Sequence, residues 1–370
     1  MAARVVATIV LAAIAVACAP TAAQDGASAS PSASVFGTRS PEPSASPPAT
    51  PAASGILRGA KRVPLEAGTN AVNADTDVLI VTRQLVDGHT TRVEALDLAT
   101  GNVTPVHEAT DAAVTVPSIR DGVITLLETR ETDVPMQLEA RVLAGRWRDP
   151  KTIVELDRFT FGLAGGDGWT AFPYPQTNGW EVAWMHTSSD GTHEVRVREA
   201  DGQLHAIYAS TSAYSFALGR YGDVAIGEFP TSATDRPALR LYSAGTLRTL
   251  AERTADEGAG YVAWELGLVV WPRSFVARFT TSIDRIAPGS LSRETVKVPA
   301  GCDDYAGVGA EMLAFRCGDH LQLEDGTKLG PPMPLLHERT IVFVPQDVQR
   351  IATVIPADTD EARPGAGARF

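Results

Sequence analysis

Two cysteines in the last quarter of this 370-residue chain are spaced to form a disulfide. Cys302 and Cys317 lie symmetrically about the Gly309-Ala310 turn. An antiparallel hairpin would therefore place the two residues opposite each other, about 4.5–5.5 Å apart, which suits disulfide formation. An oxidising compartment would preserve such a bond. The sequence thus predicts a Cys302–Cys317 disulfide, with two buried free thiols as the alternative.

The third cysteine, Cys18, ends an export signal. Arg4 supplies a positive charge, residues 5–16 form an apolar run with one Thr, and small residues precede the cysteine. Such a run is too short to span a bilayer, which takes about 20 residues, and the order of features indicates a signal peptide, residues 1–17. The cysteine after small residues resembles the lipobox of bacterial lipoproteins, although Ala15 stands where that family usually has Leu. The resemblance implies cleavage before Cys18, its modification with fatty-acyl chains such as palmitate, and anchoring at the extracytoplasmic face of the cell membrane. Plain secretion is the alternative.

Aromatic residues gather at positions 169–186, where they could form a ligand-binding surface. Pro173 and Pro175 stiffen this segment, and aromatic side chains anchor interfaces at low cost in conformational entropy. The alternative is that Trp180 and Trp184 pack between repeated structural units. The residues of this candidate binding loop are Trp169, Phe172, Tyr174, Trp180 and Trp184.

The remaining sequence lacks the signatures that specify a reaction. It contains no HExxH metalloprotease motif, no P-loop, no GxSxG elbow and no CxxC pair. We therefore predict no catalytic residue, no metal site and no cofactor, and we do not expect an enzyme. The net charge of −12 also argues against a nucleic-acid partner, because phosphate binding depends on Lys and Arg.

The segment that follows the export signal, residues 18–55, is predicted to be a disordered tether. Of the 36 residues from 19 to 54, 28 are Ala, Ser, Pro or Thr. Such a segment cannot bury enough apolar surface to offset its ordering entropy. It would hold a folded domain, residues 56–357, away from the membrane, and residues 358–370 are expected to form a flexible tail.

The predicted domain has an all-β repeat. Short apolar runs such as VLIV (78–81) and IVFV (341–344) alternate with turn signals, and long helical periodicity is absent. Two interleaved series of glycines recur about every 45 residues, which predicts a unit of roughly four strands. The third unit carries about ten extra residues. The first series is Gly122, Gly168, Gly222, Gly267 and Gly309, and the second is Gly101, Gly145, Gly202, Gly245, Gly289 and Gly326.

Four-stranded units of this length resemble the blades of a β-propeller. The sharpest local match is ALDLATGNVTPV (95–106), which is similar to WD40-like and TolB-like blades, although the Gly-His…Trp-Asp signature is missing. The resemblance covers about residues 60–355. It implies six or seven four-stranded blades, in which two strands within 338–355 complete a seventh blade or pair with the first unit. A β-sandwich or paired β-domains are the alternative.

These features favour a class of function without a substrate. An anchored propeller that lacks catalytic signatures is expected to be a binding or scaffold module for a protein, peptide or polymer outside the membrane. A propeller enzyme of glycosidase or lyase type is one alternative, and convergent carboxylates or an Arg cluster at the axial mouth would mark it. A purely structural envelope component is another.

Lipidation of Cys18 is the first testable prediction. Cells that express the wild type or Cys18→Ser would be fed a clickable fatty-acid probe, and label on the protein would be measured in a gel. We expect label on the wild type alone, because a serine hydroxyl does not replace the thiol that accepts diacylglycerol. Equal labelling of both proteins would contradict the prediction.

Overall fold

The computed structural model describes residues 61–64, 68–162, 174–212, 214–219, 221–229, 236–254, 257–274, 280–309, 311–329, 335–337, 340–343 and 351–356. The chain divides into two compact units, Met1–Ala53 and Ser54–Phe370, and every described residue belongs to the second. The predicted signal peptide, the tether, Cys18 and the C-terminal tail lie outside the described residues.

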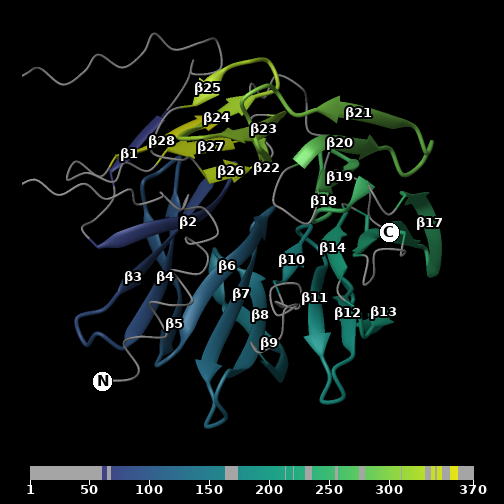
Figure 1. Cartoon of the computed structure of the whole chain (residues 1–370). Coiled ribbons are helices and arrows are strands. Elements are labelled where there is room, and N and C mark those ends of the chain that lie inside the picture. Colours follow the sequence, from purple (N-terminus) through teal and green to yellow (C-terminus); the bar gives the residue numbers. More distant parts are fainter. Residues whose placement is uncertain are drawn as a thin grey trace, which may run out of the picture. The chain divides into compact units, whose positions relative to one another are not determined.

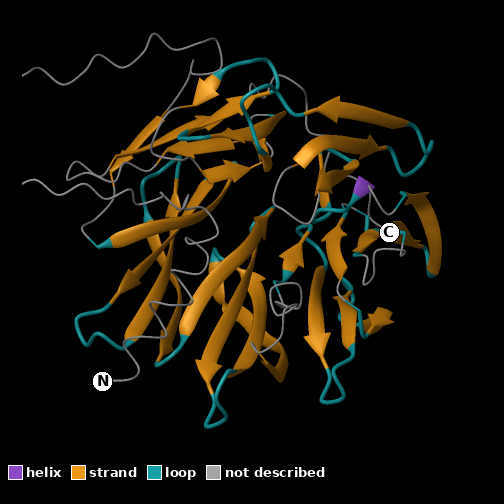
Figure 2. Cartoon of the chain, in the orientation of Figure 1, coloured by secondary structure: helices purple, strands orange, loops and turns teal. Residues whose placement is uncertain are grey.

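The described strands form seven antiparallel sheets of four strands each (Figures 1 and 2). Six sheets are blades built from four consecutive strands, which confirms the predicted β-propeller. Blades 1 and 2 are β2 (Thr69–Asp75), β3 (Val78–Gln84), β4 (Thr90–Asp97), β5 (Val103–Thr110), β6 (Ala113–Arg120), β7 (Val123–Glu131), β8 (Gln137–Arg146) and β9 (Asp149–Gly162). Blades 3 and 4 are β10 (Gln176–Thr177), β11 (Val182–Thr187), β12 (His193–Arg198), β13 (Leu204–Ser210), β14 (Tyr214–Leu218), β15 (Val224–Glu228), β16 (Ala238–Ser243) and β17 (Thr246–Glu252). Blades 5 and 6 are β18 (Ala263–Glu265), β19 (Leu268–Ser274), β20 (Thr280–Ile286), β21 (Arg293–Lys297), β22 (Asp304–Gly309), β23 (Met312–Cys317), β24 (His320–Leu323) and β25 (Lys328–Leu329).

The seventh sheet joins the N-terminal strand to the last three strands. It contains β1 (Lys61–Pro64), β26 (Leu335–His337), β27 (Thr340–Phe343) and β28 (Ile351–Pro356), in the order β1-β28-β27-β26. Strand β26 contacts β2 of blade 1 and β22 of blade 6, so this sheet lies between the first and the sixth blades and completes the ring. The two strands expected within 338–355 therefore belong to a seventh sheet, whose outer strand comes from the start of the domain.

The connections between strands give the ring two different faces. Turns between the first and second strands of a blade are short, as at Asp121 and Gly122, whose φ angles are 47° and 83°. These turns lie on the same face as those between third and fourth strands, and we call it the turn face. Connections from second to third strands, and from one blade to the next, lie on the opposite face, which we call the linker face.

The third unit begins later than the glycine series predicts. That series predicts a first turn at Gly168, whereas the turn between β10 and β11 lies at residues 178–181. Residues 163–173, between β9 of blade 2 and β10 of blade 3, lie outside the described residues. The extra residues of the sequence therefore precede the first turn of blade 3.

Apolar side chains fill the space between neighbouring blades. One cluster packs Val78 and Ile80 of blade 1 against Ile124 and Leu126 of blade 2. The next clusters join blade 2 to blade 3, blade 3 to blade 4, and so on around the described ring. Full burial of one large apolar side chain contributes about 1.5–3 kcal/mol. Each blade therefore obtains this stabilisation only when its neighbours are in place.

A second contact between blades recurs at one position of the second strand. This position, which we call the clamp position, lies near the end of the second strand. It is six residues after one residue of the preceding turn: Asp77, Gly122, Trp180, Gly222, Gly267 or Glu311. The clamp residues are Arg83, Glu128, His186, Glu228, Arg273 and Cys317. In blades 2, 3 and 4 each clamp residue reaches a partner on the outer strand of the preceding blade. The pairs are His107–Glu128 (2.5 Å), Asp157–His186 (2.8 Å) and Tyr208–Glu228 (2.7 Å).

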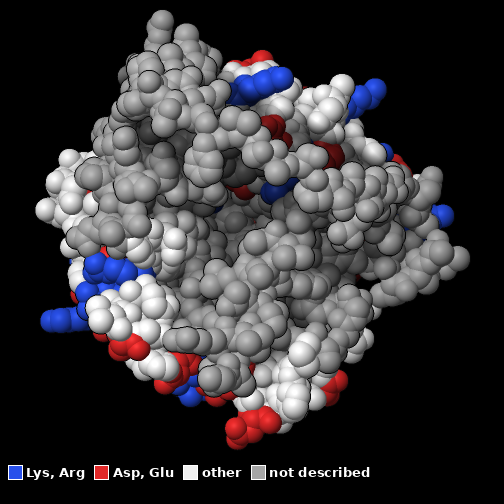
Figure 3. Space-filling view, turned by 60° about the vertical axis from the view of Figure 1, so that its left-hand side comes forward, with Lys and Arg blue, Asp and Glu red and all other residues white. Residues whose placement is uncertain are grey.

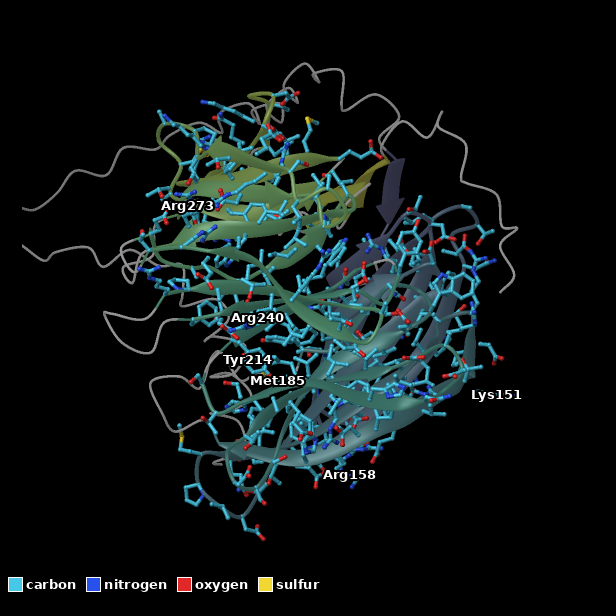
Figure 4. The ribbon with its side chains drawn as sticks, turned by 90° about the vertical axis from the view of Figure 1, so that its right-hand side faces the viewer. Lys151, Arg158, Met185, Tyr214, Arg240 and Arg273 are labelled. Carbon is cyan, nitrogen blue, oxygen red and sulfur yellow. A yellow bond between two sulfur atoms is a disulfide. The ribbon has the colours of Figure 1, made fainter. Side chains whose placement is uncertain are left out.

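Arginines of the third strand complete these contacts. Arg141 bonds Glu128, Arg196 bonds Asp157 and Arg240 bonds Glu228. In Figure 4, Arg240 of blade 4 lies between Arg273 of blade 5 and Arg158 of blade 2, as the order of the blades requires. A carboxylate that burial removes from water is compensated when it accepts hydrogen bonds from an arginine.

The clamp of blade 5 surrounds a fully buried carboxylate. Asp284 of β20 and Arg253, on the linker from blade 4, are both inaccessible to solvent, and their Oδ2 and Nη2 atoms are 2.5 Å apart. The clamp residue Arg273, with Arg293 and Thr295, also bonds Asp284. Burial alone would raise the pKa of Asp284, but the hydrogen bonds from Arg293, Arg253 and Thr295 hold that pKa at about 2.

The disulfide occupies the clamp position of blade 6. Cys302 lies on the linker from blade 5, and Cys317 ends β23; their sulfurs are bonded, which confirms the predicted pair. The hairpin itself differs from the prediction. Gly309 pairs with Met312 across its turn, and a bulge between Tyr305 and Gly307 shifts the register. Cys302 therefore precedes β22, and the bond fastens the linker to blade 6.

Asp284 provides a test of the clamp. We expect Asp284→Asn to lower the free energy of unfolding by about 3–5 kcal/mol, because buried Arg253 loses its counter-charge. Urea denaturation followed by circular dichroism measures the change. The exposed Glu131→Gln variant is the matched control and should stay within about 0.5 kcal/mol of the wild type.

The pH dependence gives the same test a direction. The pKa of Asp284 is lower in the folded protein than in the unfolded chain, so its ionised form stabilises the fold above about pH 4. The difference between wild type and Asp284→Asn should shrink as the pH falls from about 4 towards 2. A variant as stable as Glu131→Gln at neutral pH would contradict this role.

Candidate functional site

The predicted binding loop does not form one surface. Trp169 and Phe172 lie outside the described residues. Trp184 is fully buried on β11, where it packs in the cluster between blades 2 and 3, and its Nε1 donates to Asp157 Oδ2 at 2.7 Å. Trp184 is therefore a core residue, which corrects its assignment to a binding surface. Tyr174 and Trp180 are both exposed, but they lie on the linker face and the turn face, respectively.

Trp180 is held out into solvent by a rigid turn. Its side chain is 69% exposed, whereas Asn178, two residues earlier, is buried. The Asn178 Oδ1 atom accepts the backbone N–H groups of Trp180 and Glu181 at 3.0 and 2.8 Å. Its Nδ2 atom donates to Glu181 Oε2 at 2.7 Å and to the Gly219 carbonyl at 2.9 Å. One buried amide thus fixes the turn below an exposed indole and joins it to blade 4.

Neighbouring blades leave this turn no room to move. Gly179 has a φ of 94°, and a Cβ atom there would lie 2.7 Å from the Cβ of Asp121 in blade 2. In blade 4, a Cβ on Gly219 would lie 2.6 Å from the ring of Trp264 in blade 5. Both glycines are required by close approach, so the turns of blades 2 to 5 support one another.

Tyr221 extends the exposed aromatic surface to the next blade. It lies in the turn that precedes β15 and is 90% exposed. The Glu181 carboxylate reaches this turn, because a Cβ on Gly222 would lie 2.7 Å from Glu181 Oε1. We call Trp180, Glu181, Tyr221 and Asp223 the Trp180–Tyr221 rim.

The charges that act on Glu181 are negative. Burial raises the pKa of this carboxyl, the hydrogen bond from Asn178 lowers it, and nearby Glu199 and Asp223 raise it further. No cation contributes to the shift of this pKa among the described groups. The rim therefore combines two exposed aromatic rings with carboxylates that repel one another. A titratable group shifted by burial and like charges is a candidate functional residue.

The linker face carries a second aromatic group. Tyr261 precedes β18 and is exposed, and its ring lies 5.5 Å from that of Phe229 in an edge-on arrangement. Tyr174, which precedes β10, is close enough that burial and Tyr261 raise its pKa. Tyr174, Phe229 and Tyr261 form the linker-face aromatic group.

The marks expected of an enzyme are present only in part. Carboxylates do approach one another at the rim. The arginines around Asp284 are held by that carboxylate, so they form an internal ion network. Within the described ranges no group of three His, Cys, Asp or Glu side chains is placed to hold a metal ion. The described residues also contain no helix that is long and apolar enough to cross a membrane. On the surface in Figure 3, described acidic and basic side chains are interspersed.

Comparison with known proteins supports the fold. No family model matches the chain, and no sequence among the curated proteins matches it. Similar solved structures include a prolyl endopeptidase, with 10% identity and a TM-score of 0.53, which covers 80% of this chain and 49% of that one. An oligogalacturonate lyase from Vibrio parahaemolyticus has 9% identity and a TM-score of 0.50, over 80% of this chain and 91% of that one. The chain thus spans about half the length of the prolyl endopeptidase.

A third similar structure differs from this chain in how its ring closes. The β-propeller domain of the Trilobed protease from Pyrococcus furiosus has 7% identity and a TM-score of 0.50, over 80% of this chain and 94% of that domain. That domain has an open velcro topology, whereas β1 here pairs with β28. At these identities the likeness shows the β-propeller fold alone.

Sequence reasoning missed most of the rim. It singled out Trp180 but not Glu181, Tyr221 or Asp223. A signal was available, because Tyr221 directly precedes Gly222, a member of the repeating glycine series. Large residues beside such glycines occupy turn tips. Tyr261 gave no comparable signal, because it lies on a linker without a repeating pattern.

Substitution of the two tryptophans is expected to affect stability very differently. We expect Trp184→Ala to lower the free energy of unfolding by about 3–5 kcal/mol, because it leaves a cavity between blades 2 and 3. Trp180→Ala should change it by about 0.5 kcal/mol or less, because its ring is mostly in water. Urea denaturation curves measure both. Equal destabilisation by the two substitutions would show that Trp180 also packs in the fold.

Proposed function

We propose that this protein is an exported, membrane-anchored propeller that binds a protein, peptide or polymer outside the membrane. The observation that carries the proposal is Trp180, a large aromatic side chain that a rigid turn holds in water. Tryptophan is strongly enriched among the residues that dominate binding energy at interfaces. An indole fixed before binding also loses little conformational entropy when a partner covers it.

The surrounding structure supports a binding role for this turn. Every hydrogen-bonding atom of the Asn178 amide is used to shape it, and glycines allow the neighbouring blades to approach it. The exposed ring itself contributes nothing comparable to the fold. Rigid surroundings that hold an exposed side chain in place are what a preorganised contact requires.

The proposed location rests on the sequence and on the disulfide. The signal-like N-terminus and Cys18 favour an anchored protein at the extracytoplasmic face. The Cys302–Cys317 bond agrees with an oxidising compartment, since disulfides rarely persist where thiols are kept reduced. The tether would then present the propeller to partners at a distance from the lipid surface.

An enzyme of glycosidase or lyase type is the second candidate. The observation in its favour is Glu181, whose raised pKa beside Asp223 suits a carboxyl that donates a proton. Solved structures of similar fold are named as peptidases and a lyase. Turnover of a glycan by the wild type, lost in Glu181→Gln, would replace the binding proposal with this one.

The binding proposal is tested by capture with matched aromatic variants. Full-length tagged protein is incubated with an envelope extract from the same cells, and captured proteins or polymers are identified and titrated. We expect Trp180→Ala to weaken capture about thirtyfold, as loss of a hot spot worth about 2 kcal/mol would. Tyr261→Ala, on the linker face, is the control and should capture normally.

The two variants separate the faces of the propeller. Loss of capture by Tyr261→Ala with normal capture by Trp180→Ala would move the site to the linker-face aromatic group. Normal capture by both folded variants would remove both aromatic surfaces from the contact. Melting curves of each variant show whether it is folded.

A further inference from the structure

The Trp180–Tyr221 rim has the chemistry to select one kind of partner. We infer that it binds a positively charged polypeptide segment, with a Lys or Arg side chain placed against Glu181 and Asp223 and its aliphatic stem on the two aromatic rings. This inference rests on the proposed function and adds the class of ligand. The argument uses exposure, adjacency of the two turns and charge.

The two aromatic residues lie on turns that are joined across two blades. The Asn178 side chain bonds the Gly219 carbonyl at 2.9 Å, so the turns that carry Trp180 and Tyr221 are joined directly. Both rings are exposed, at 69% and 90%. An exposed pair of this size on adjacent rigid turns suits a partner that covers both rings at once.

Aromatic faces and carboxylates attract the same kind of group. The face of an indole or phenol ring carries negative electrostatic potential and binds ammonium and guanidinium groups. Carboxylates at the same place add charge-assisted hydrogen bonds. The long stems of Lys and Arg also bury apolar surface while their charged ends remain at polar groups. Each component of the rim therefore favours a cationic side chain over an anionic or a neutral one.

The carboxylates of the rim lack a compensating cation among the described contacts. Glu181 bonds Asn178, a neutral amide, and its charged neighbours are Glu199 and Asp223. Glu199 itself faces His205 at 3.4 Å. Arg120, at the end of β6, has an interaction partner of its own. A ligand cation would relieve the repulsion among these carboxylates, and an anionic ligand would increase it.

The clamps inside the ring show the contrast. There, Glu128 and Glu228 each bond an arginine of the third strand. The chain thus supplies its own cation where a carboxylate stabilises the fold. At the rim, Glu181 bonds the Asn178 amide, and no described arginine bonds it, although Arg198 ends β12 opposite Val182. A cationic residue of the partner can therefore take that place.

A polypeptide fits better than a small cation. No group of described side chains is placed to enclose a metal ion. The rings of Trp180 and Tyr221 belong to different blades, and a single small amine would not cover both. A peptide segment that carries a cationic residue among apolar or small ones contacts both rings and the carboxylates together.

Defined peptides test the inference with the full-length protein in detergent. The probes are fluorescein-labelled peptides of Gly-Arg, Gly-Gln and Gly-Glu, each dipeptide repeated five times, and binding is measured by anisotropy. We expect binding of the Gly-Arg peptide alone. Its affinity should fall about tenfold or more in Trp180→Ala and Tyr221→Ala, and several-fold in Glu181→Gln and Asp223→Asn. It should also fall as salt rises from about 50 to 300 mM, because the pair is solvent-exposed.

Matched controls distinguish the rim from the general acidity of the chain. Glu131→Gln removes one exposed carboxylate on the linker face, and Tyr261→Ala removes one exposed aromatic ring there; both should bind the Gly-Arg peptide as the wild type does. Trp180→Ala alters no charge, so its loss of binding would report the surface itself. Equal binding of the Gly-Gln peptide, or wild-type affinity in Glu181→Gln and Asp223→Asn, would overturn the inference. Full displacement of the peptide by an equal concentration of spermine would assign the rim to small polyamines and would also overturn it.

The outcomes separate this inference from the proposed function. If Trp180→Ala loses its partner from the envelope extract but no variant changes Gly-Arg binding, the propeller binds through Trp180 and the ligand class is wrong. If Trp180→Ala leaves both measurements unchanged, the rim is not a binding surface and both proposals fall.

Discussion

Burial of apolar surface between blades is the constraint on which the structure depends. A four-stranded sheet of this kind has a hydrophobic face that its own strands cannot cover, so Val78, Ile124 or Trp271 is removed from water only by the neighbouring blade. The ring must therefore close, and β1 supplies the outer strand of the seventh sheet. The same constraint fixes where the chain can vary, because strands that face a neighbour on both sides tolerate little change in volume.

At the clamp position, side chains of different chemical types hold neighbouring blades together. A histidine, a carboxylate, an arginine or a cysteine occupies the same place on the second strand. In blades 2 to 6 the clamp residue reaches a partner on the preceding blade or on the linker that leaves it, whereas Arg83 of blade 1 bonds Glu94 of its own blade. The disulfide of blade 6 is the covalent counterpart of the side-chain hydrogen bonds that join the clamp residues of blades 2 to 5 to the preceding blade or its linker.

The repeat could be predicted from sequence because glycines mark many of its turns. Gly122, Gly222 and Gly267 adopt positive φ in the first turns of blades 2, 4 and 5. The buried tryptophans could not be separated from the exposed one, since Trp180 and Trp184 differ only in their position relative to a turn that the extra residues had displaced. The rim was missed for a physical reason: Trp180, Glu181, Tyr221 and Asp223 come from two blades, and nothing local in the sequence shows that Asn178 joins their turns.

Contacts between blades make the turns of the rim rigid, but they do not explain why two of its residues are aromatic. Asn178, Gly179 and Gly219 are fixed by their neighbours, since a larger or less polar residue at any of them would disrupt contacts between blades. The contacts between blades do not require Trp180 or Tyr221, and a smaller polar residue at either place would leave the packing intact. Large aromatic side chains in water raise the risk of nonspecific association. Their presence at two adjacent, rigid turns is therefore best explained by contact with a binding partner. The ring fixes the positions of the two side chains, and the side chains supply the affinity.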